Sequence, residues 1–273
     1  MCAVCGCGPH ASSLEGGHVH DHGHAHAHGH DHAHDHAHAH GSHDEHEEAS
    51  RLLRLEADLL SRNDRIAQEN RDFLARIGSV AFNLIGGPGS GKTSLLERTI
   101  RTLGREMPIA VLEGDQETDL DAERIRMTGV PVLQINTGSG CHLNAEMVGR
   151  SLRRLEPRPG SVVFVENVGN LVCPALFDVG EHAKILVASV TEGPEKPLKY
   201  PQIFREAHVL VLNKTDLLPH LDVGLHAYVE NARRVNPDLR IFSVSCTKGI
   251  GLRPFFDWIV ATARAETAAA RGG

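Results

Sequence analysis

The chain has 273 residues, a formal net charge of −7 and 41% hydrophobic residues. Its first fifty residues contain fifteen of the twenty histidines and eight acids but no Lys or Arg, so residues 51–273 carry a net charge of about +1. This near-neutral body lacks the basic surface of a nucleic-acid-binding protein. No apolar run reaches the roughly 18–20 residues of a membrane span, and the start lacks the basic and apolar segments of a secretory signal. We therefore expect neither nucleic-acid nor membrane partners.

The cysteines and the length favour a reduced, cytoplasmic protein. Six cysteines, three of them within the first seven residues, suit thiolates kept for metal better than a disulfide framework. Composition divides the chain into a disordered tail over residues 1–43, a helix over 44–78 and a domain over 79–273. About 220 residues after the tail suffice for one α/β domain with a sizeable core.

The tail carries two metal-ligand patterns. Cys2, Cys5 and Cys7 form C-x-x-C-x-C, which lets one turn converge soft thiolates on one ion; a redox pair or unstructured thiols are the alternatives. Histidine then occupies every second position, and imidazole binds Ni, Zn, Cu and Co. We favour low-selectivity metal binding over a purification tag or an inert linker. The run comprises His18, His20, His22, His24, His26, His28, His30, His32, His34, His36, His38 and His40.

The segment 44–78 has the period of an amphipathic helix. Leu52, Leu55, Leu59, Ile66, Phe73 and Ile77 recur at three-, four- and seven-residue steps. Asp44 is a candidate cap and Gly78 a candidate stop. We expect this apolar stripe to pack against the domain.

Short apolar runs alternate with helical stretches from Ser79 onward, which predicts a mainly parallel sheet with helices on both faces. The last helix should start near Leu252, and the Ala-rich end should fray. We expect strands at residues 80–85, 108–112, 132–135, 161–165, 184–190, 207–212 and 240–244.

The first of these strands leads into a phosphate-binding motif. Residues 86–93 read GGPGSGKT and match G-x-x-x-x-G-K-[ST], and a helix follows from Ser94. Backbone N–H groups of such a loop surround phosphate oxygens, Lys92 reaches the β and γ phosphates, and Thr93 offers its hydroxyl to Mg²⁺. A glycine-rich turn arising by chance is the alternative. The predicted nucleotide ligands are Gly86, Gly87, Gly89, Ser90, Gly91, Lys92, Thr93 and Ser94.

Two acids follow later strands, where ligands of such folds sit. Asp115 could hold Mg²⁺ through water or orient the attacking water; the alternative is a helix-capping loop acid, as for Asp119. Glu166 stands at the Walker-B position and is a second candidate for Mg²⁺. Gly169, three residues on, could donate its N–H to the γ-phosphate. We expect Lys92, Asp115 and Glu166 to serve catalysis.

The motif N-K-x-D predicts guanine specificity. It comprises Asn213, Lys214 and Asp216, whose carboxylate can accept from guanine N1–H and N2–H₂, whereas adenine presents an acceptor there. Lys214 would stack along the base. The loop Ser245, Cys246 and Thr247 would close over the base edge.

Cys141, His142 and Cys173 complete the candidate ligands. Two thiols and an imidazole can form three corners of a tetrahedral Zn or Ni site. A buried structural cysteine is the alternative. Cys173 lies seven residues after Glu166, inside the segment that should respond to the γ-phosphate.

Together these motifs resemble those of the HypB-type hydrogenase nickel-incorporation GTPases, within the SIMIBI class of P-loop GTPases. The resemblance covers nearly the whole chain and includes both the cysteine start and the His-rich tail. It rests on Cys2-x-x-Cys5-Gly6-Cys7, the P-loop, Glu113-Gly114-Asp115, Asn136-Thr137-Gly138, Cys141-His142, Glu166-Asn167-Val168-Gly169-Asn170, Cys173-Pro174 and Asn213-Lys214-Thr215-Asp216.

The resemblance implies a GTPase that uses GTP and Mg²⁺ to place nickel in [NiFe] hydrogenase. It implies a tight nickel site at Cys2, Cys5 and Cys7, and a Ni/Zn site at Cys141, His142 and Cys173 near a GTP-dependent homodimer interface. The implied partners are a second nickel-binding accessory protein and the hydrogenase large-subunit precursor. A urease nickel GTPase, a nickel-storage protein and a metabolite kinase are the alternatives. Leu217, Leu218 and Leu221 are a candidate apolar dimer contact.

Overall fold

The computed structural model describes residues 42–115, 120–138, 140–222 and 224–272. The cysteine motif at Cys2, Cys5 and Cys7, the histidine run and Asp119 therefore lie outside the described residues. The chain divides into two compact units, residues 1–58 and 59–273. The fold and the sites below belong to the second unit.

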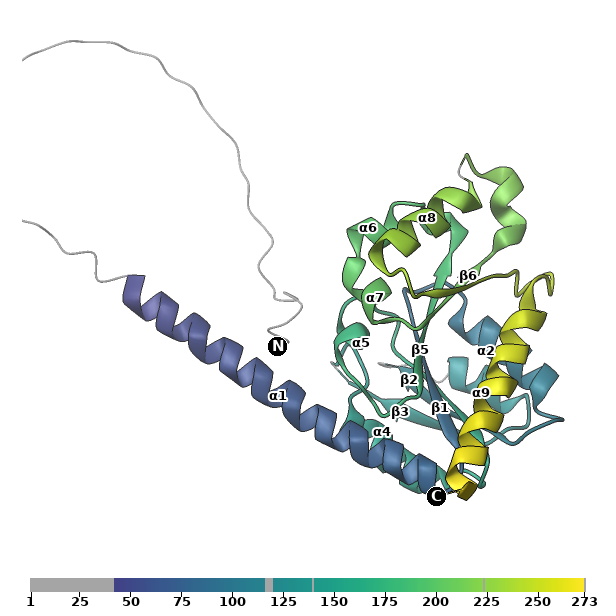
Figure 1. Cartoon of the computed structure of the whole chain (residues 1–273), viewed down its shortest axis with the longest axis horizontal. Helices are drawn as coiled ribbons and strands as arrows, with labels where there is room; N and C mark the ends of the chain where they lie inside the picture. Colours follow the sequence, from purple (N-terminus) through teal and green to yellow (C-terminus); the bar gives the residue numbers. More distant parts are fainter. Residues whose placement is uncertain (1–41, 116–119, 139, 223, 273) are drawn as a thin grey trace, which may run out of the picture. The chain divides into compact units, whose positions relative to one another are not determined.

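Strands and helices alternate along the described residues, as Figure 1 shows. The strands are β1 (Val80–Ile85), β2 (Ile109–Asp115), β3 (Val132–Asn136), β4 (Val162–Glu166), β5 (Ala183–Ser189), β6 (Val209–Asn213) and β7 (Arg240–Ser243). The α-helices are α1 (Ser42–Arg76), α2 (Lys92–Leu103), α3 (Leu120–Arg126), α4 (Ala145–Leu155), α5 (Cys173–Leu176), α6 (Lys196–Lys199), α7 (Pro201–Glu206), α8 (Leu225–Val235) and α9 (Leu252–Gly272). Two 3₁₀ turns, η1 (Val190–Glu192) and η2 (Thr215–His220), follow β5 and β6.

The seven strands form one parallel sheet in the order β3-β2-β4-β1-β5-β6-β7. Each predicted strand is present; β1 has the predicted bounds, and the ends of the others are shifted by at most three residues. The largest shift is in β2, which runs on to Asp115 because Gly114 and Asp115 stay in register with Ile135 and Asn136. Because parallel strands end at one edge, the acids at the ends of β2 and β4 are brought to the side of the P-loop.

The core forms two layers because side chains alternate across the strands. On one face, Phe82 and Phe164 pack with α2, α3 and α9. On the other face, Val163 and Leu210 belong to clusters shared with α4, α7 and α8. Strands buried on both sides read as continuous apolar runs, which is why the sequence pattern located them.

The packing face of α1 differs from the predicted apolar stripe. Leu59 is 63% exposed, whereas the buried positions are Asn63, Ala67, Asn70 and Leu74. The predicted stripe was right for Phe73, which packs against the core, but wrong for Leu59, because two of the buried side chains are amides that bond to the backbone of residues 178 and 145. The helix also begins before Asp44, which is therefore not its cap. Gly78 follows the helix with φ 61° and closes the turn to Ala75.

The chain end also departs from expectation. We expected the Ala-rich end to fray, but α9 continues to Gly272, since alanine has the highest helix propensity. Thr267 Oγ1 donates to the Gly78 carbonyl at 2.9 Å and attaches this helix to the start of β1. Among the helices of the described part, none has the length and apolar character that crossing a membrane requires.

Candidate nucleotide and metal site

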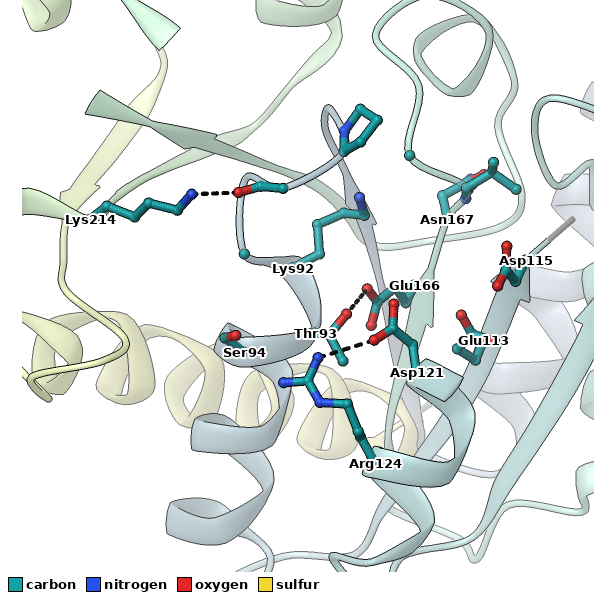
Figure 2. A pocket seen from close by; sticks show the side chains of 16 residues that line it. Lys92, Thr93, Ser94, Glu113, Asp115, Asp121, Arg124, Glu166, Asn167 and Lys214 are labelled. Carbon is teal, nitrogen blue, oxygen red and sulfur yellow. Dashed lines mark hydrogen bonds and ion pairs between the residues drawn. The ribbon is translucent and has the colours of Figure 1, made fainter. Parts of the chain in front are cut away.

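A cavity of about 560 Å³ lies at the carboxyl edge of the sheet, beside the P-loop (Figure 2). It sits where the strand order reverses, with β4 and β5 on the two sides of β1. Its lining includes Lys92, Thr93, Asp115, Glu166 and Gly169, so the cavity gathers residues predicted for phosphate, Mg²⁺ and the γ-phosphate.

The P-loop conformation requires glycine at two positions. Gly86 has φ 143°, and a Cβ there would lie 2.2 Å from the Val187 carbonyl oxygen. Gly91 has φ 100°, and a Cβ would lie 2.3 Å from Asn213 Nδ2. The N-terminus of α2 has no side-chain cap. Its first backbone N–H groups therefore suit an anion bound in the cavity.

Two side chains at the start of α2 meet the acid that ends β4. Lys92 Nζ donates to the carbonyls of Gly86 and Gly87, at 3.2 and 3.4 Å. Burial lowers the pKa of Lys92, while the charge of Glu166 opposes that shift. Thr93 Oγ1 donates to Glu166 Oε1 at 2.7 Å, and burial raises the pKa of Glu166 to about 7 despite this bond. Glu166 Oε2 is buried without a hydrogen-bond partner among the described residues.

Further charged residues surround this pair. Glu113 and Asp115 on β2 line the same cavity, together with Asp121 from α3. Arg124, one turn after Asp121, donates to it at 3.1 Å and to Glu97 on α2 at 3.0 Å, which joins the two helices. Asp121 and Arg124 were not predicted as site residues. The sequence signal for them is an acid and a base one helical turn apart, shortly after the acid that ends a strand.

The segment after β4 packs on the P-loop. Gly169 lies against Pro88, to which a Cβ would approach within 3.3 Å. Gly86 and Asn170 form an isolated antiparallel bridge. The predicted γ-phosphate sensor therefore lies in direct contact with the phosphate loop.

The N-K-x-D motif connects the loop to the base end of the site. Asn213 Nδ2 donates to Ser90 O at 3.0 Å, and its Oδ1 accepts from Cys246 N–H at 3.1 Å. Lys214, with φ 63°, donates to Gly89 O at 2.6 Å (Figure 2). Asp216 Oδ1 is buried and lacks a hydrogen-bond partner among the described residues, so it is available for a donor such as a guanine edge.

The loop after β7 is fixed by local contacts. Ser245 bridges Ile250, and its Oγ accepts from Lys248 N–H at 3.1 Å. The Cys246 side chain is 3% exposed in the hydrophobic core, and burial raises its pKa to about 11. Thr247 O accepts from Arg98 on α2 at 3.0 Å. The loop thus presents backbone rather than the Cys246 thiol.

Cys141, His142 and Cys173 lie together, with one ligand atom from each within 4.8 Å of the others. Cys141 Sγ is 3.5 Å from His142 Nδ1. Cys173 opens α5 and is 1% exposed, whereas the other two are half-buried. The His142 ring stacks on Phe177 at 4.0 Å, and burial lowers its pKa, which favours the neutral imidazole that binds metal. Two sulfurs and one imidazole suit Ni²⁺ or Zn²⁺.

Comparison with known proteins identifies the family. Residues 80–243 match the family described as "CobW/HypB/UreG, nucleotide-binding domain". A hydrogenase maturation factor HypB of Azotobacter vinelandii is 57% identical over 210 residues, 77% of this chain and 69% of its own length. The chain belongs to the HypB family.

Two solved HypB structures share this fold. That of Archaeoglobus fulgidus is 37% identical, with a TM-score of 0.70, over 75% of this chain and 100% of its own. That of Helicobacter pylori, in complex with nickel, is 32% identical, with a TM-score of 0.70, over 76% of this chain and 97% of its own. The predicted parallel α/β fold and the resemblance to HypB are confirmed.

Proposed function

We propose that this chain is a GTP-hydrolysing nickel metallochaperone that serves [NiFe] hydrogenase maturation in the cytoplasm. The observation that carries the proposal is the segment from Glu166 to Cys173. Its first residues line the nucleotide cavity and pack on the P-loop, and its last residue belongs to the Cys141–His142–Cys173 cluster. One short segment therefore joins a phosphate site to a metal site.

The chain's own residues supply the elements of GTP hydrolysis. Lys92 would leave its two loop carbonyls for the β and γ phosphates, and the N–H of Gly169 would reach the γ-phosphate. Asp115 would orient the attacking water from the end of β2. Asp216 would accept from guanine N1–H and N2–H₂, and Lys214 would lie along the base.

Thr93 on α2 and Glu166 at the end of β4 also suit Mg²⁺. A hydroxyl and a buried carboxylate with one unpartnered oxygen form a hard oxygen donor set, which Mg²⁺ prefers. Thr93 and Glu166 would hold the ion, with Asp115 bound directly or through water. When bound, the ion would neutralise charge that develops on the phosphates.

Nickel is the cargo in this proposal. The H. pylori relative is described in complex with nickel, and the A. vinelandii relative as a hydrogenase maturation factor. GTP would bring two copies together, with Leu217, Leu218 and Leu221 at the contact; all three are half-buried. A second accessory protein and the hydrogenase large-subunit precursor would receive the metal. Zn²⁺ would compete for the same cluster.

Substitution of Lys92 by Ala distinguishes delivery from storage. In cells that lack the native protein, this variant should fail to restore hydrogenase activity and should lose phosphate release from GTP by at least about 100-fold. Arg105→Ala, an exposed change after α2, is the control. Restored hydrogenase activity with Lys92→Ala would favour a storage role.

Two other outcomes concern the remaining alternatives. Restored urease rather than hydrogenase activity by the wild-type chain would favour the urease alternative. A requirement for an acceptor metabolite in GTP turnover would favour a kinase.

A further inference from the structure

Asn167 connects the nucleotide cavity to the metal-binding loop. The residue follows Glu166 directly, lines the cavity and is 1% exposed. Its Oδ1 accepts two backbone N–H groups, one from Val168 and one from Leu143, both at 3.0 Å. Leu143 is the residue after His142. One amide side chain therefore contacts both the γ-phosphate segment and the loop that carries two metal ligands.

The amide nitrogen of Asn167 begins a series of polar contacts that ends near Cys173, the third metal ligand. Its Nδ2 donates to Asn83 Oδ1 on β1 at 3.3 Å, and Asn83 Nδ2 donates to Glu181 Oε1 at 3.4 Å. Glu181 lies 4.0 Å from Lys184, whose Nζ donates to Ala175 O at 2.8 Å. Ala175 is two residues after Cys173. We call Asn167, Asn83, Glu181 and Lys184 the buried polar chain.

All four members of the buried polar chain are at most 7% exposed. A buried polar group that loses its hydrogen-bond partner destabilises the fold. These side chains therefore hold the segments that they contact in place. The buried polar chain begins at the nucleotide cavity and contacts the backbone beside His142 and the backbone beside Cys173. It lies within the second unit throughout.

We propose that Asn167 is the positioning residue through which nucleotide state sets the geometry of the Cys141–His142–Cys173 cluster. When the γ-phosphate accepts hydrogen bonds from the backbone N–H groups of residues 168 and 169, the Val168 N–H that donates to Asn167 Oδ1 is displaced. The bond to Leu143 then shifts with it, and the His142 side of the cluster moves relative to Cys173. This inference rests on the proposed nucleotide-controlled metal site.

Asn63 provides a matched control because it also bonds to backbone near the metal ligands. Its Oδ1 accepts Ala145 N–H at 2.9 Å, and its Nδ2 donates to Asp178 O at 2.7 Å. It is a buried amide that bridges the same two ligand-bearing segments, but it lies on α1 and does not line the nucleotide cavity. Replacing Asn63 by Ala should therefore lower the Ni²⁺ affinity of the cluster by the same factor in both nucleotide states.

The test measures Ni²⁺ affinity in the full chain with Cys2, Cys5 and Cys7 replaced by Ala, under saturating GDP or a slowly hydrolysed GTP analogue. Thiolate-to-nickel absorption reports the cluster, and Cys141→Ala gives the background. The ratio of the two affinities should be about five- to 150-fold in this parent chain and about one in Asn167→Ala. Asn63→Ala should weaken both affinities by the same factor and keep the ratio.

The outcomes separate the two proposals. If Asn167→Ala keeps the parent's ratio of Ni²⁺ affinities between the two nucleotide states, the role of Asn167 alone is overturned. The same holds if Asn63→Ala lowers that ratio as much as Asn167→Ala does. No difference between nucleotide states in the parent chain overturns the nucleotide-controlled site and this inference together.

A variant that fails to fold or to bind nucleotide is replaced by Asn167→Ser, whose hydroxyl is too short to reach both partners. Hydrogen exchange of the unmodified chain needs no variant. The peptide that spans residues 141–147 should change its deuterium uptake between GDP and the GTP analogue, and unchanged uptake overturns the inference.

Discussion

Thr93 Oγ1 donates to Glu166 Oε1 at 2.7 Å, and the second oxygen of that carboxylate is buried without a hydrogen-bond partner among the described residues. A hydroxyl from the first turn of α2 thus meets an acid from the end of β4. Burying a carboxylate is unfavourable unless a partner neutralises it. The pair therefore suits the Mg²⁺ ion that we propose for this site.

Replacing Glu166 by Gln should keep the acceptor for Thr93 and remove the charge. We expect the Mg²⁺ concentration for half-maximal GTP hydrolysis to rise at least about 10-fold and the maximal rate to fall roughly 100-fold. Phosphate release measured across a Mg²⁺ titration checks this. Glu97→Gln, on α2 and paired with Arg124, is the control and should behave like wild type. An unaltered Mg²⁺ dependence in Glu166→Gln would remove this residue from the site.

Replacing Asp216 by Asn should change the preferred base. The buried carboxylate oxygen can accept from the guanine amine, whereas an amide N–H would face that amine and leave donors unpaired. We expect GDP affinity to fall by about 10²–10⁴ and xanthosine diphosphate, which presents a carbonyl there, to bind better. Equilibrium binding of both nucleotides checks this. Equal GDP affinity in the variant and the wild type would mean that another group reads the base.

Deleting residues 18–40 should lower the number of Ni²⁺ ions bound and leave GTP hydrolysis intact. The deleted imidazoles are predicted to be low-selectivity metal ligands, whereas the described residues that line the nucleotide cavity lie between Pro88 and Lys214. Metal stoichiometry by equilibrium dialysis, with phosphate release measured in parallel, checks this. Loss of GTP hydrolysis would contradict the modular arrangement.

The Cys246 thiol should resist alkylation at neutral pH. Burial raises its pKa to about 11 from an ordinary 9, so the reactive thiolate is reduced by about 100-fold. Because the folded pKa is the higher one, the resulting stabilisation is complete below pH 9 and is lost as the pH rises through 11. Mass-spectrometric rates of iodoacetamide labelling at pH 8, folded and in urea, check this. Equal folded and unfolded rates would show an accessible thiolate.

The sequence was sufficient for the sheet and for the nucleotide loop. Strands buried on both faces are continuous apolar runs, so residues such as Val163 and Leu210 marked them directly. The P-loop glycines were predictable because their backbone and close contacts exclude a Cβ, as at Gly86 and Gly91. These features depend on local residues.

Long-range polar contacts were not predictable. The apolar stripe of α1 suggested packing through Leu59, which is exposed, whereas the amides Asn63 and Asn70 are buried because loop carbonyls from residues 178 and 179 accept their amide protons. Asn167 likewise reads as an ordinary residue after a strand. Its two acceptor contacts exist only once residues 143 and 168 are brought together by folding.

In the proposed function, the phosphate site controls the metal site. The most direct measurement is the Ni²⁺ dissociation constant of the Cys141–His142–Cys173 cluster, in a full chain that lacks the three N-terminal thiols, with bound GDP and with a slowly hydrolysed GTP analogue. A coupling of about 1–3 kcal/mol predicts affinities that differ by about five- to 150-fold. Identical dissociation constants in the two nucleotide states would contradict it.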